Sequence, residues 1–503
     1  MTVPATVPLP DNRVSTGVSG LDDVLLGGFP RSHFYLIEGD PGAGKTTLGL
    51  QFLLRGRDQG EKCLYVTLSE TKRELGEIAA SHGWCLEGIE ICELGDVEDR
   101  LNPERQYTVF HPAEIELSET TKRILDEVDR AQPSRVVFDS LSELRLLARE
   151  DLRYRRQILG LKQFFSVKEC TVLLLDDRSE RAADNPQLQS ISHGAILLER
   201  LGVEYGIPRR RLSVSKMRGS HFREGFHDFT IQRGGLNVFP RLVAAEHTSL
   251  LEQYEVVPSG APQLDALLGG GLLRGTSALL MGPAGSGKST LIAQYALAEA
   301  DRGRRVACYI YEETRSTFLA RSKGLGMNLI PHIEQGMVHL QQVDPAEMSP
   351  GQFAHSVRWA VESGTKMIMI DSLNGYLNGM PSERYLLVHM HELLTYLAQQ
   401  GVLTMLTVAQ HGMVGGTLQV PVEVSYLADS VIMLRFFEAA GEVHRAISVM
   451  KKRHGLHEST IREFALSANG IRIGKPLKEF RGVLTGVPMY TGASGPLLSD
   501  VSD

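Results

Sequence analysis

Two glycine-rich segments of the chain have the composition and spacing of phosphate-binding loops. Both match the pattern G-x-x-x-x-G-K-[ST], in which small residues let backbone N–H groups turn inward toward phosphate oxygens. The lysine that ends each loop begins a helix, so the positive end of the helix dipole faces the bound anion. The first loop comprises Gly39, Asp40, Pro41, Gly42, Ala43, Gly44, Lys45, Thr46 and Thr47, and the second comprises Gly282, Pro283, Ala284, Gly285, Ser286, Gly287, Lys288, Ser289 and Thr290.

The lysine and hydroxyl residues at the end of each loop indicate which ligand the loop binds. We expect Lys45 and Lys288 to reach the β- and γ-phosphates of a nucleoside triphosphate. We expect the hydroxyls of Thr46 and Ser289 to hold Mg²⁺. The sequence therefore predicts two sites for ATP and Mg²⁺.

The two loops lie in two copies of one domain. Lys45 and Lys288 are 243 positions apart, and other residues repeat at the same offset. We therefore expect an N-terminal domain over residues 1–243, a C-terminal domain over 244–490 and a short disordered tail over 491–503. The repeated pairs are Gly17 and Gly260, Leu21 and Leu264, Asp22 and Asp265, and Glu70 and Glu313.

Each copy alternates short apolar runs with helical patterns, which is typical of an α/β domain with a mostly parallel sheet covered by helices on both faces. Helices are expected over Glu70–Ala80 and Glu119–Ala131. The expected strands are His33–Glu38, Cys63–Leu68, Arg135–Asp139, Thr171–Asp176 and Ala195–Leu198 in the first copy, and Ser277–Met281, Val306–Tyr311, Met367–Asp371, Leu403–Ala409 and Ser430–Leu434 in the second.

Acidic residues follow two of these strands in each copy. Asp139 and Asp371 each end an apolar strand and precede Ser-Leu, so their carboxylates should face the phosphates and orient Mg²⁺. Glu312 and Glu313 follow another strand and are candidates for the base that positions the attacking water, with Glu313 also a candidate metal ligand. Glu70 is the corresponding acid of the first copy; these glutamates could instead cap the next helix.

A Lys-x-Arg pair occurs late in each copy, as Lys216 with Arg218 and Lys451 with Arg453. On a strand this spacing places both cations on one face, as a cationic finger for a neighbouring subunit's γ-phosphate requires. The alternatives are a solvated strand edge, or a nucleic-acid patch formed together with Arg209–Arg211.

Composition argues against several classes of partner. The net charge of −7 does not favour nucleic acid, and no apolar run is long enough to span a membrane. The five cysteines show no metal-binding spacing, which is typical of a reducing cytoplasm. We therefore expect a cytoplasmic protein.

With these residues assembled, the chain resembles the KaiC family of RecA-like ATPases, which have two such domains. The resemblance covers about residues 14 to 485 and rests on the tandem loops, Glu312-Glu313-Thr314, the Asp-Ser-Leu strand ends and Lys216-Met217-Arg218-Gly219. The family resemblance implies two RecA-like domains in a hexameric ring of identical subunits, with ATP held between neighbours.

The resemblance also implies a division of labour. The first domain would be mainly an ATPase, served by Lys45, Thr46 and Asp139, while the second would add autophosphorylation. In the second domain Lys288, Ser289 and Asp371 would bind the nucleotide, and Glu312 with Glu313 would be the catalytic acids. The two Lys-x-Arg pairs would contact phosphate across the subunit interface. A KaiB-like protein or a histidine kinase is the kind of partner expected.

Three positions depart from the family pattern. Ser69 stands where the first domain of the family has the first acid of its pair. The phosphorylated Ser-Thr pair of the family corresponds here to Ser425 and Tyr426, which are the candidate phosphorylation sites. His454 replaces a glycine, and the tail after Arg481 is short.

Two other functions remain open from the sequence. One is a DNA motor of the wider RecA group, in which the loop His411–Val420 would line a pore and DNA would stimulate hydrolysis. The other is an interaction platform that ATP assembles with little turnover.

Overall fold

The computed structural model describes residues 12–94, 112–148, 150–178, 186–202, 206–248, 255–378, 385–410, 425–439, 441–484 and 489–490. The chain divides into two units, Met1–Arg241 and Leu242–Asp503. The predicted pore loop His411–Val420 and the predicted disordered tail lie outside the described residues. None of the helices in the described part of the chain is long and apolar enough to cross a membrane.

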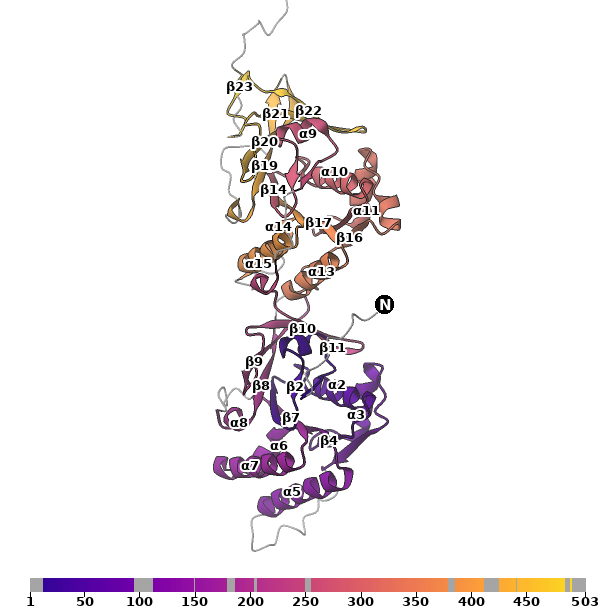
Figure 1. Ribbon diagram of the computed structural model, residues 1–503, viewed down its shortest axis with the longest axis vertical. Helices are drawn as coiled ribbons and strands as arrows, with labels where there is room; N and C mark the ends of the chain where they lie inside the picture. Colours follow the sequence, from indigo (N-terminus) through magenta and orange to yellow (C-terminus); the bar gives the residue numbers. More distant parts are fainter. Residues whose placement is uncertain are drawn as a thin grey trace, which may run out of the picture. The chain divides into compact units, whose positions relative to one another are not determined.

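The first unit is built on a nine-stranded sheet with the strand order β11-β10-β9-β8-β3-β7-β6-β4-β5 (Figure 1). The strands from β8 to β5 run parallel, and β9, β10 and β11 extend the sheet in antiparallel fashion. Its elements are β1 (Arg13–Val14), α1 (Leu21–Val24), β2 (Phe29–Pro30), β3 (Phe34–Gly39), α2 (Lys45–Asp58), β4 (Cys63–Thr67), α3 (Lys72–Ser81), β5 (Ile89–Glu93), α5 (Pro112–Ala131), β6 (Arg135–Asp139), α6 (Leu141–Ala148), α7 (Asp151–Val167), β7 (Thr171–Asp177), α8 (Pro186–Ile191), β8 (Gly194–Leu201), β9 (Arg209–Met217), β10 (His227–Gln232) and β11 (Gly235–Phe239).

The second unit repeats this plan, with the strand order β16-β15-β17-β18-β14-β19-β20-β21-β22. Here β16 to β19 run parallel and β20 to β22 are antiparallel. Its elements are η3 (Ala244–Glu246), β12 (Val256–Val257), α9 (Pro262–Leu267), β13 (Leu272–Leu273), β14 (Ser277–Gly282), α10 (Lys288–Asp301), β15 (Arg305–Ile310), α11 (Arg315–Gly324), α12 (Ile330–Glu334), β16 (Val338–Gln342), α13 (Pro350–Glu362), β17 (Thr365–Asp371), α14 (Leu373–Asn378), α15 (Leu386–Gln399), β18 (Leu403–Ala409), η4 (Ser425–Leu427), β19 (Ser430–Ala439), β20 (Glu442–Lys452), β21 (Arg462–Ser467), β22 (Gly470–Pro476), β23 (Phe480–Arg481) and β24 (Met489–Tyr490).

The predicted fold class is confirmed: each unit is an α/β domain with a mostly parallel sheet between helices. The parallel strands are apolar on both faces because helices cover both, as α10 does on one face of β14 and α13 with α15 on the other. The antiparallel strands were not predicted, because their polar and charged residues interrupt any apolar run.

The strand register places every functional loop of a unit at one of two edges. Parallel strands share their carboxyl edge, and Gly39, Asp139 and Asp177 all lie there as the last residues of β3, β6 and β7. The phosphate loops follow β3 and β14 at this edge. The opposite, amino edge carries the beginnings of β8 and β19.

A buried arginine joins the sheet of the first unit to the segments that surround it. Arg135 begins β6, is fully buried, and stacks over the Phe52 ring at 4.7 Å. Its guanidinium donates to the carbonyl oxygens of Ser15 at 2.8 Å and Phe52 at 3.0 Å, to Gln59 Oε1 at 2.7 Å, and to the Glu61 carboxylate. Because a buried charge is stable only when paired, this network ties β6 to α2 and to the N-terminal segment.

We predict that Arg135→Met lowers the free energy of unfolding of the first unit by about 3–5 kcal/mol, because two buried carbonyls lose their donor and Glu61 loses its buried partner. Arg31→Ala is the matched control: Arg31 pairs with the same Glu61 at 3.0 Å but is 42% exposed, so about 1 kcal/mol or less is expected. Denaturant unfolding followed by Trp84 fluorescence in a Trp359→Phe background measures both. Equal losses for the two variants would contradict this account.

Candidate functional site

Both phosphate loops adopt the tight turn that the sequence predicts. Gly44 and Gly287 precede α2 and α10 with φ values of 109° and 107°, in the left-handed region that favours glycine. The Lys45 ammonium donates to the carbonyl oxygens of Gly39 at 2.8 Å and Asp40 at 3.0 Å. The Lys288 ammonium donates in the same way to Gly282 and Pro283, at 2.8 Å each. Each lysine thus folds over its own loop, where a phosphate would sit.

The first loop has an acidic neighbour that the sequence analysis missed. Asp177 Oδ1 lies 2.7 Å from Lys45 Nζ, and its other oxygen accepts a bond from Ser142 Oγ at 3.3 Å. Asp177 pairs with Gly39 in the sheet, and the residue that pairs with Gly282 in the second domain is Ala409. A signal was present in the sequence, since Asp177 directly follows the predicted strand Thr171–Asp176, but only the register shows that Asp177 reaches the lysine.

Asp139 lies beside the predicted magnesium ligand of the first domain. Thr46 Oγ1 donates to Asp139 Oδ2 at 3.0 Å, and the Tyr65 hydroxyl donates to the same oxygen at 2.5 Å. Burial raises the pKa of Asp139, while these two hydrogen bonds and the charge of Lys45 oppose the rise. The paired hydroxyl and carboxylate fit Mg²⁺, which prefers oxygen ligands.

The second domain holds its strand-end aspartate differently. Asp371 accepts a hydrogen bond from Thr407, on the neighbouring strand β18. At the position of Tyr65 the second domain has Cys308, whose thiol instead contacts Met369. Burial lowers the pKa of Lys288, and the charges of Asp371 and Glu312 oppose this shift.

The adjacent glutamates of the second domain have separate partners. Glu312 accepts a hydrogen bond from Ser372, the residue after Asp371, and its charge acts on Lys288. Glu313 is paired with Arg321 on α11 at 2.6 Å, and the same guanidinium donates to Thr290 in the phosphate loop at 3.2 Å. Glu312 is therefore the acid nearer to the strand-end aspartate, and the role of Glu313 as a metal ligand stays a prediction.

Neither Glu70 nor the pair in the second domain caps a helix. Thr71 is the N-cap of α3 and forms a capping box with Glu74, and Thr314 is the N-cap of α11. The predicted helix Glu70–Ala80 therefore begins at Lys72, and the capping interpretation of these acids is wrong.

Glu70 itself is half-buried near the nucleotide site. Its Oε2 has no hydrogen-bond partner among the described residues, and burial together with the charge of Asp139 raises its pKa to about 7. The second-domain counterpart Glu313 pairs with Arg321, whereas Ile78 occupies the arginine position in the first domain. Glu70 is thus an unneutralised carboxyl beside the site, as a general base requires.

The Lys-x-Arg pairs lie at the amino edge of each sheet. Lys216 donates to the carbonyls of Gln189 and, at 2.7 Å, Ser192, while Arg218 donates to Ser190 at 2.7 Å. The register pairs Lys216 with Ala195, near the beginning of β8. Both cations therefore contact the end of α8. They lie on the same side of the sheet, as their Lys-x-Arg spacing predicts.

The second pair has the same surroundings in its own domain. Lys451 donates to the carbonyls of Ser425 at 3.1 Å and Ala428 at 2.7 Å. Arg453 pairs with Asp429 at 3.1 Å and donates to the Tyr426 carbonyl at 3.3 Å. The candidate phosphorylation sites Ser425 and Tyr426 are exposed in η4. The structure thus brings the two cations to the backbone of the turn that carries Ser425 and Tyr426 and leads into β19.

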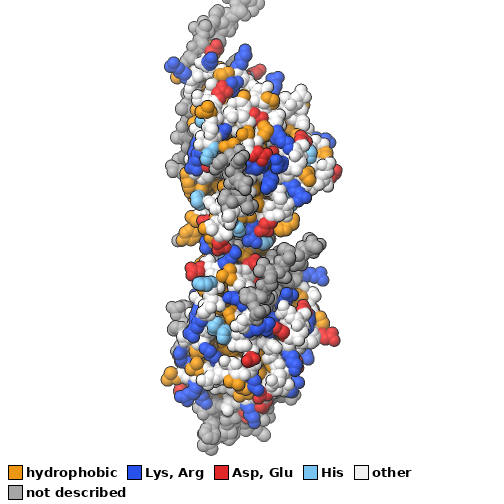
Figure 2. All heavy atoms as spheres, viewed as in Figure 1, with side chains coloured by type: hydrophobic (Ala, Val, Ile, Leu, Met, Phe, Trp, Pro, Cys, Tyr) orange, Lys and Arg blue, Asp and Glu red, His pale blue; other side chains and the backbone are white. Residues whose placement is uncertain are grey.

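In the alternative nucleic-acid patch at Arg209–Arg211, the first and last arginines are not free cations. Arg209 is buried, and Arg211 pairs with Glu199 at 2.6 Å. On the face drawn in Figure 2, acidic and basic side chains are interspersed over both units. Such a surface does not match the basic groove with aromatic platforms that binds single strands.

Comparison with known proteins agrees with this geometry. The family model described as "ATPase: KaiC" matches residues 14–243 and again residues 257–478. The chain is 26% identical to the circadian clock protein KaiC3 of Synechocystis sp., with 96% of this chain and 95% of that protein covered. It is 27% identical to KaiC2 of the same organism, covering 94% of this chain and 83% of that protein.

A third relative is the circadian clock oscillator protein KaiC of Acaryochloris marina, 25% identical over 95% of this chain and 91% of that protein. The matches extend over both domains and include both nucleotide sites. Two phosphate loops, each with its strand-end aspartate and its own acid, therefore occur in a chain that belongs to the KaiC family of ATPases.

Proposed function

We propose that this chain forms a hexameric ring that hydrolyses ATP at the interfaces between subunits and phosphorylates itself on serine in the second domain. The observation that carries the proposal is the position of the two Lys-x-Arg pairs. Each lies at the amino edge of its sheet, whereas the phosphate loop of the same domain lies at the carboxyl edge.

The distance along the strands excludes contact within one domain. Lys451 pairs with Val431, which pairs with Leu279, three residues before Gly282 at the phosphate loop. Three residues of extended strand span about 10 Å, which is longer than a lysine side chain reaches. A phosphate at one loop can therefore meet such a pair only from another subunit. A head-to-tail contact that repeats in this way gives a ring where the rotation between subunits closes and an open filament where it does not, and we propose the ring.

The residues at each site fit ATP and Mg²⁺. In our proposal the loop amides and Lys45 or Lys288 bind the phosphates, and the Thr46 hydroxyl with Asp139, or Ser289 with Asp371, holds Mg²⁺ through oxygen. Magnesium would neutralise charge on the phosphates. Glu312 would orient the attacking hydroxyl or water in the second domain, and Glu70 would do so in the first.

Ser425 is the acceptor that the surroundings favour. Ser425 is exposed, and the cations of Lys451 and Arg453 donate hydrogen bonds to backbone carbonyls of the turn that carries it. A phosphate added there gains charge-assisted hydrogen bonds. Because η4 is at the amino edge, the phosphate would come from the neighbouring subunit's second-domain ATP. Regulation by a KaiB-like protein or a histidine kinase would follow from the family and is part of the same proposal.

Incubating the full chain with Mg²⁺ and γ-labelled ATP tests the kinase step. We expect label in the protein, and we expect Ser425→Ala to reduce it at least tenfold because the accepting hydroxyl is removed. Tyr426→Phe is the matched control on the same turn and should retain the label. Release of free phosphate alone, with no labelled protein, would contradict autophosphorylation and favour a platform or a plain ATPase.

The hydrolysis step in the first domain should depend on pH through Glu70. A base works only when deprotonated, so with a pKa of about 7 the rate should fall as the pH drops below 7 and level off above it. Phosphate release by a Lys288→Ala chain, which leaves the first site intact, measures this.

Glu70→Gln should lower that rate by about a hundredfold or more and remove the rising limb of the pH profile. Glu77→Gln alters an exposed carboxylate on the neighbouring helix α3 and serves as the control. An unchanged profile in Glu70→Gln would show that another group is the base.

A further inference from the structure

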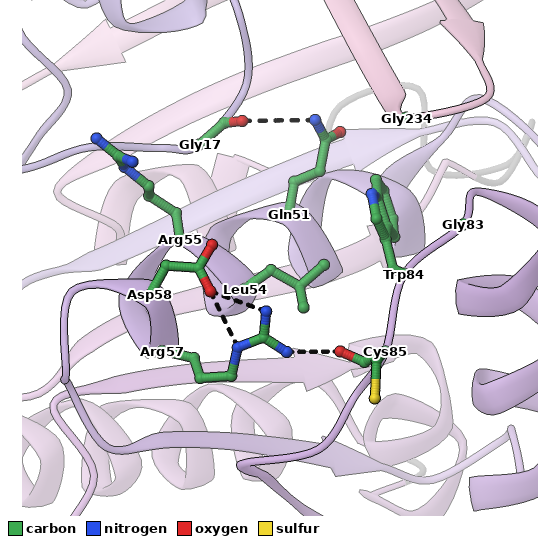
Figure 3. A pocket seen from close by; sticks show the side chains of 10 residues that line it. All are labelled: Gly17, Gln51, Leu54, Arg55, Arg57, Asp58, Gly83, Trp84, Cys85 and Gly234. Carbon is green, nitrogen blue, oxygen red and sulfur yellow. Dashed lines mark hydrogen bonds and ion pairs between the residues drawn. The ribbon is translucent and has the colours of Figure 1, made fainter.

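The first unit contains a pocket at the far end of the helix that begins at the phosphate loop. The pocket has a volume of about 370 Å³ and lies against the last turns of α2, the loop after α3 and the turn between β10 and β11 (Figure 3). With about 1.5 Å of rise per residue, the end of α2 at Asp58 is about 20 Å from Lys45. The pocket is therefore separate from the nucleotide site, and its size is in the range of small-ligand sites.

Two side chains give the pocket its shape. Arg57 donates to the Cys85 carbonyl at 2.6 Å and pairs with Asp58 at 2.8 Å, which holds the loop after α3 against the helix. The Gln51 amide accepts from the Leu236 N–H at 2.7 Å and so fixes the position of β11. Because these groups are occupied by the fold, they form the walls of the pocket and are not free for a ligand.

Two other lining residues are available to a ligand. Arg55 is exposed at the pocket, and its guanidinium makes no hydrogen bond or ion pair with any described residue. Trp84 is half-buried, and its ring packs on His82 at 4.7 Å. In Figure 3 Arg55 and Trp84 lie on opposite sides of the pocket, with Gln51 and Leu54 between them. A cationic side chain and an aromatic ring thus line the same concave surface.

The second domain provides an internal comparison, because it retains the framework of the pocket and lacks its chemistry. The offset of 243 residues keeps two of the three lining glycines, the glutamine and the aspartate, and it replaces both arginines and the tryptophan. The retained residues are Gly260, Gln294, Asp301 and Gly326, and the replacements are Ala298 for Arg55, Ala300 for Arg57 and Met327 for Trp84. The charge and the ring are therefore not needed for this fold.

We propose that this pocket binds a small molecule that joins an anionic group to a planar ring, of the purine mononucleotide class. Arg55 binds the anion, since guanidinium suits phosphate and carboxylate, and the Trp84 ring packs against the planar part. The proposal does not depend on the ring assembly or on the kinase activity proposed above.

Cys85 is a reporter inside the pocket. It is the exposed cysteine among the described residues: Cys63, Cys170 and Cys308 are buried, and burial raises the pKa of Cys92 to about 11. The experiment measures the alkylation rate of Cys85 by iodoacetamide in the full chain, by peptide mass spectrometry, at increasing concentrations of AMP. We expect AMP to slow alkylation at least fivefold and saturably, and inorganic phosphate at the same concentrations to have little effect.

Variants separate this pocket from the phosphate loops. Arg55→Ala should abolish the protection, Arg55→Lys should keep part of it, and Trp84→Leu should weaken it. Arg73→Ala, an exposed arginine on α3 outside the pocket, should leave the protection unchanged. The proposal is overturned if AMP gives no protection, if inorganic phosphate protects equally, or if Arg55→Ala retains full protection, which would place the effect at a phosphate loop.

Discussion

In each domain, the anion site and the cation pair lie on opposite edges of the same parallel sheet. The way in which this protein could complete a nucleotide site depends on that separation. It follows from strand direction: a loop after β14 and a strand end that pairs with the beginning of β19 cannot meet within one domain. The repeat applies the same constraint twice, with Lys45 opposite Lys216 and Lys288 opposite Lys451. In the proposed function, assembly completes each site, because an isolated subunit lacks the cation pair that a γ-phosphate would meet.

The two domains share one fold but differ in the charged and polar residues around their phosphate loops. In the first domain Lys45 is paired with Asp177, Asp139 accepts a hydrogen bond from Tyr65, and Glu70 has no cationic partner among the residues that the structure describes. In the second domain Ala409, Cys308 and the pair of Glu313 with Arg321 occupy the corresponding positions. Such changes alter the affinity for phosphate and the pKa of the base while the backbone stays the same. The two sites are therefore suited to different rates, and their shared loops do not make them equivalent.

Sequence reasoning reached the parallel strands, the loops and the strand-end aspartates because each has a strong local signal. Long apolar runs predict buried strands, and glycine with lysine at fixed spacing predicts a phosphate loop. Asp177 and Arg321 were missed because their roles depend on register and on a contact between a helix and a loop, which no local pattern encodes. The helix boundary at Thr71 was misplaced because Glu70 is also a common first-turn residue. The antiparallel strands were missed because their alternating charged residues resemble surface loops.

Mixing two inactive chains tests the central claim most directly. Both would carry Lys45→Ala to silence the first domain; one would add Lys288→Ala, which leaves its cation pair intact, and the other Arg453→Ala, which leaves its phosphate loop intact. If each second-domain site is shared between subunits, each chain alone is inactive and random mixing restores phosphate release at about a quarter of the interfaces. Failure to recover any activity in mixed assemblies would contradict the shared site and require Lys451 and Arg453 to serve another purpose.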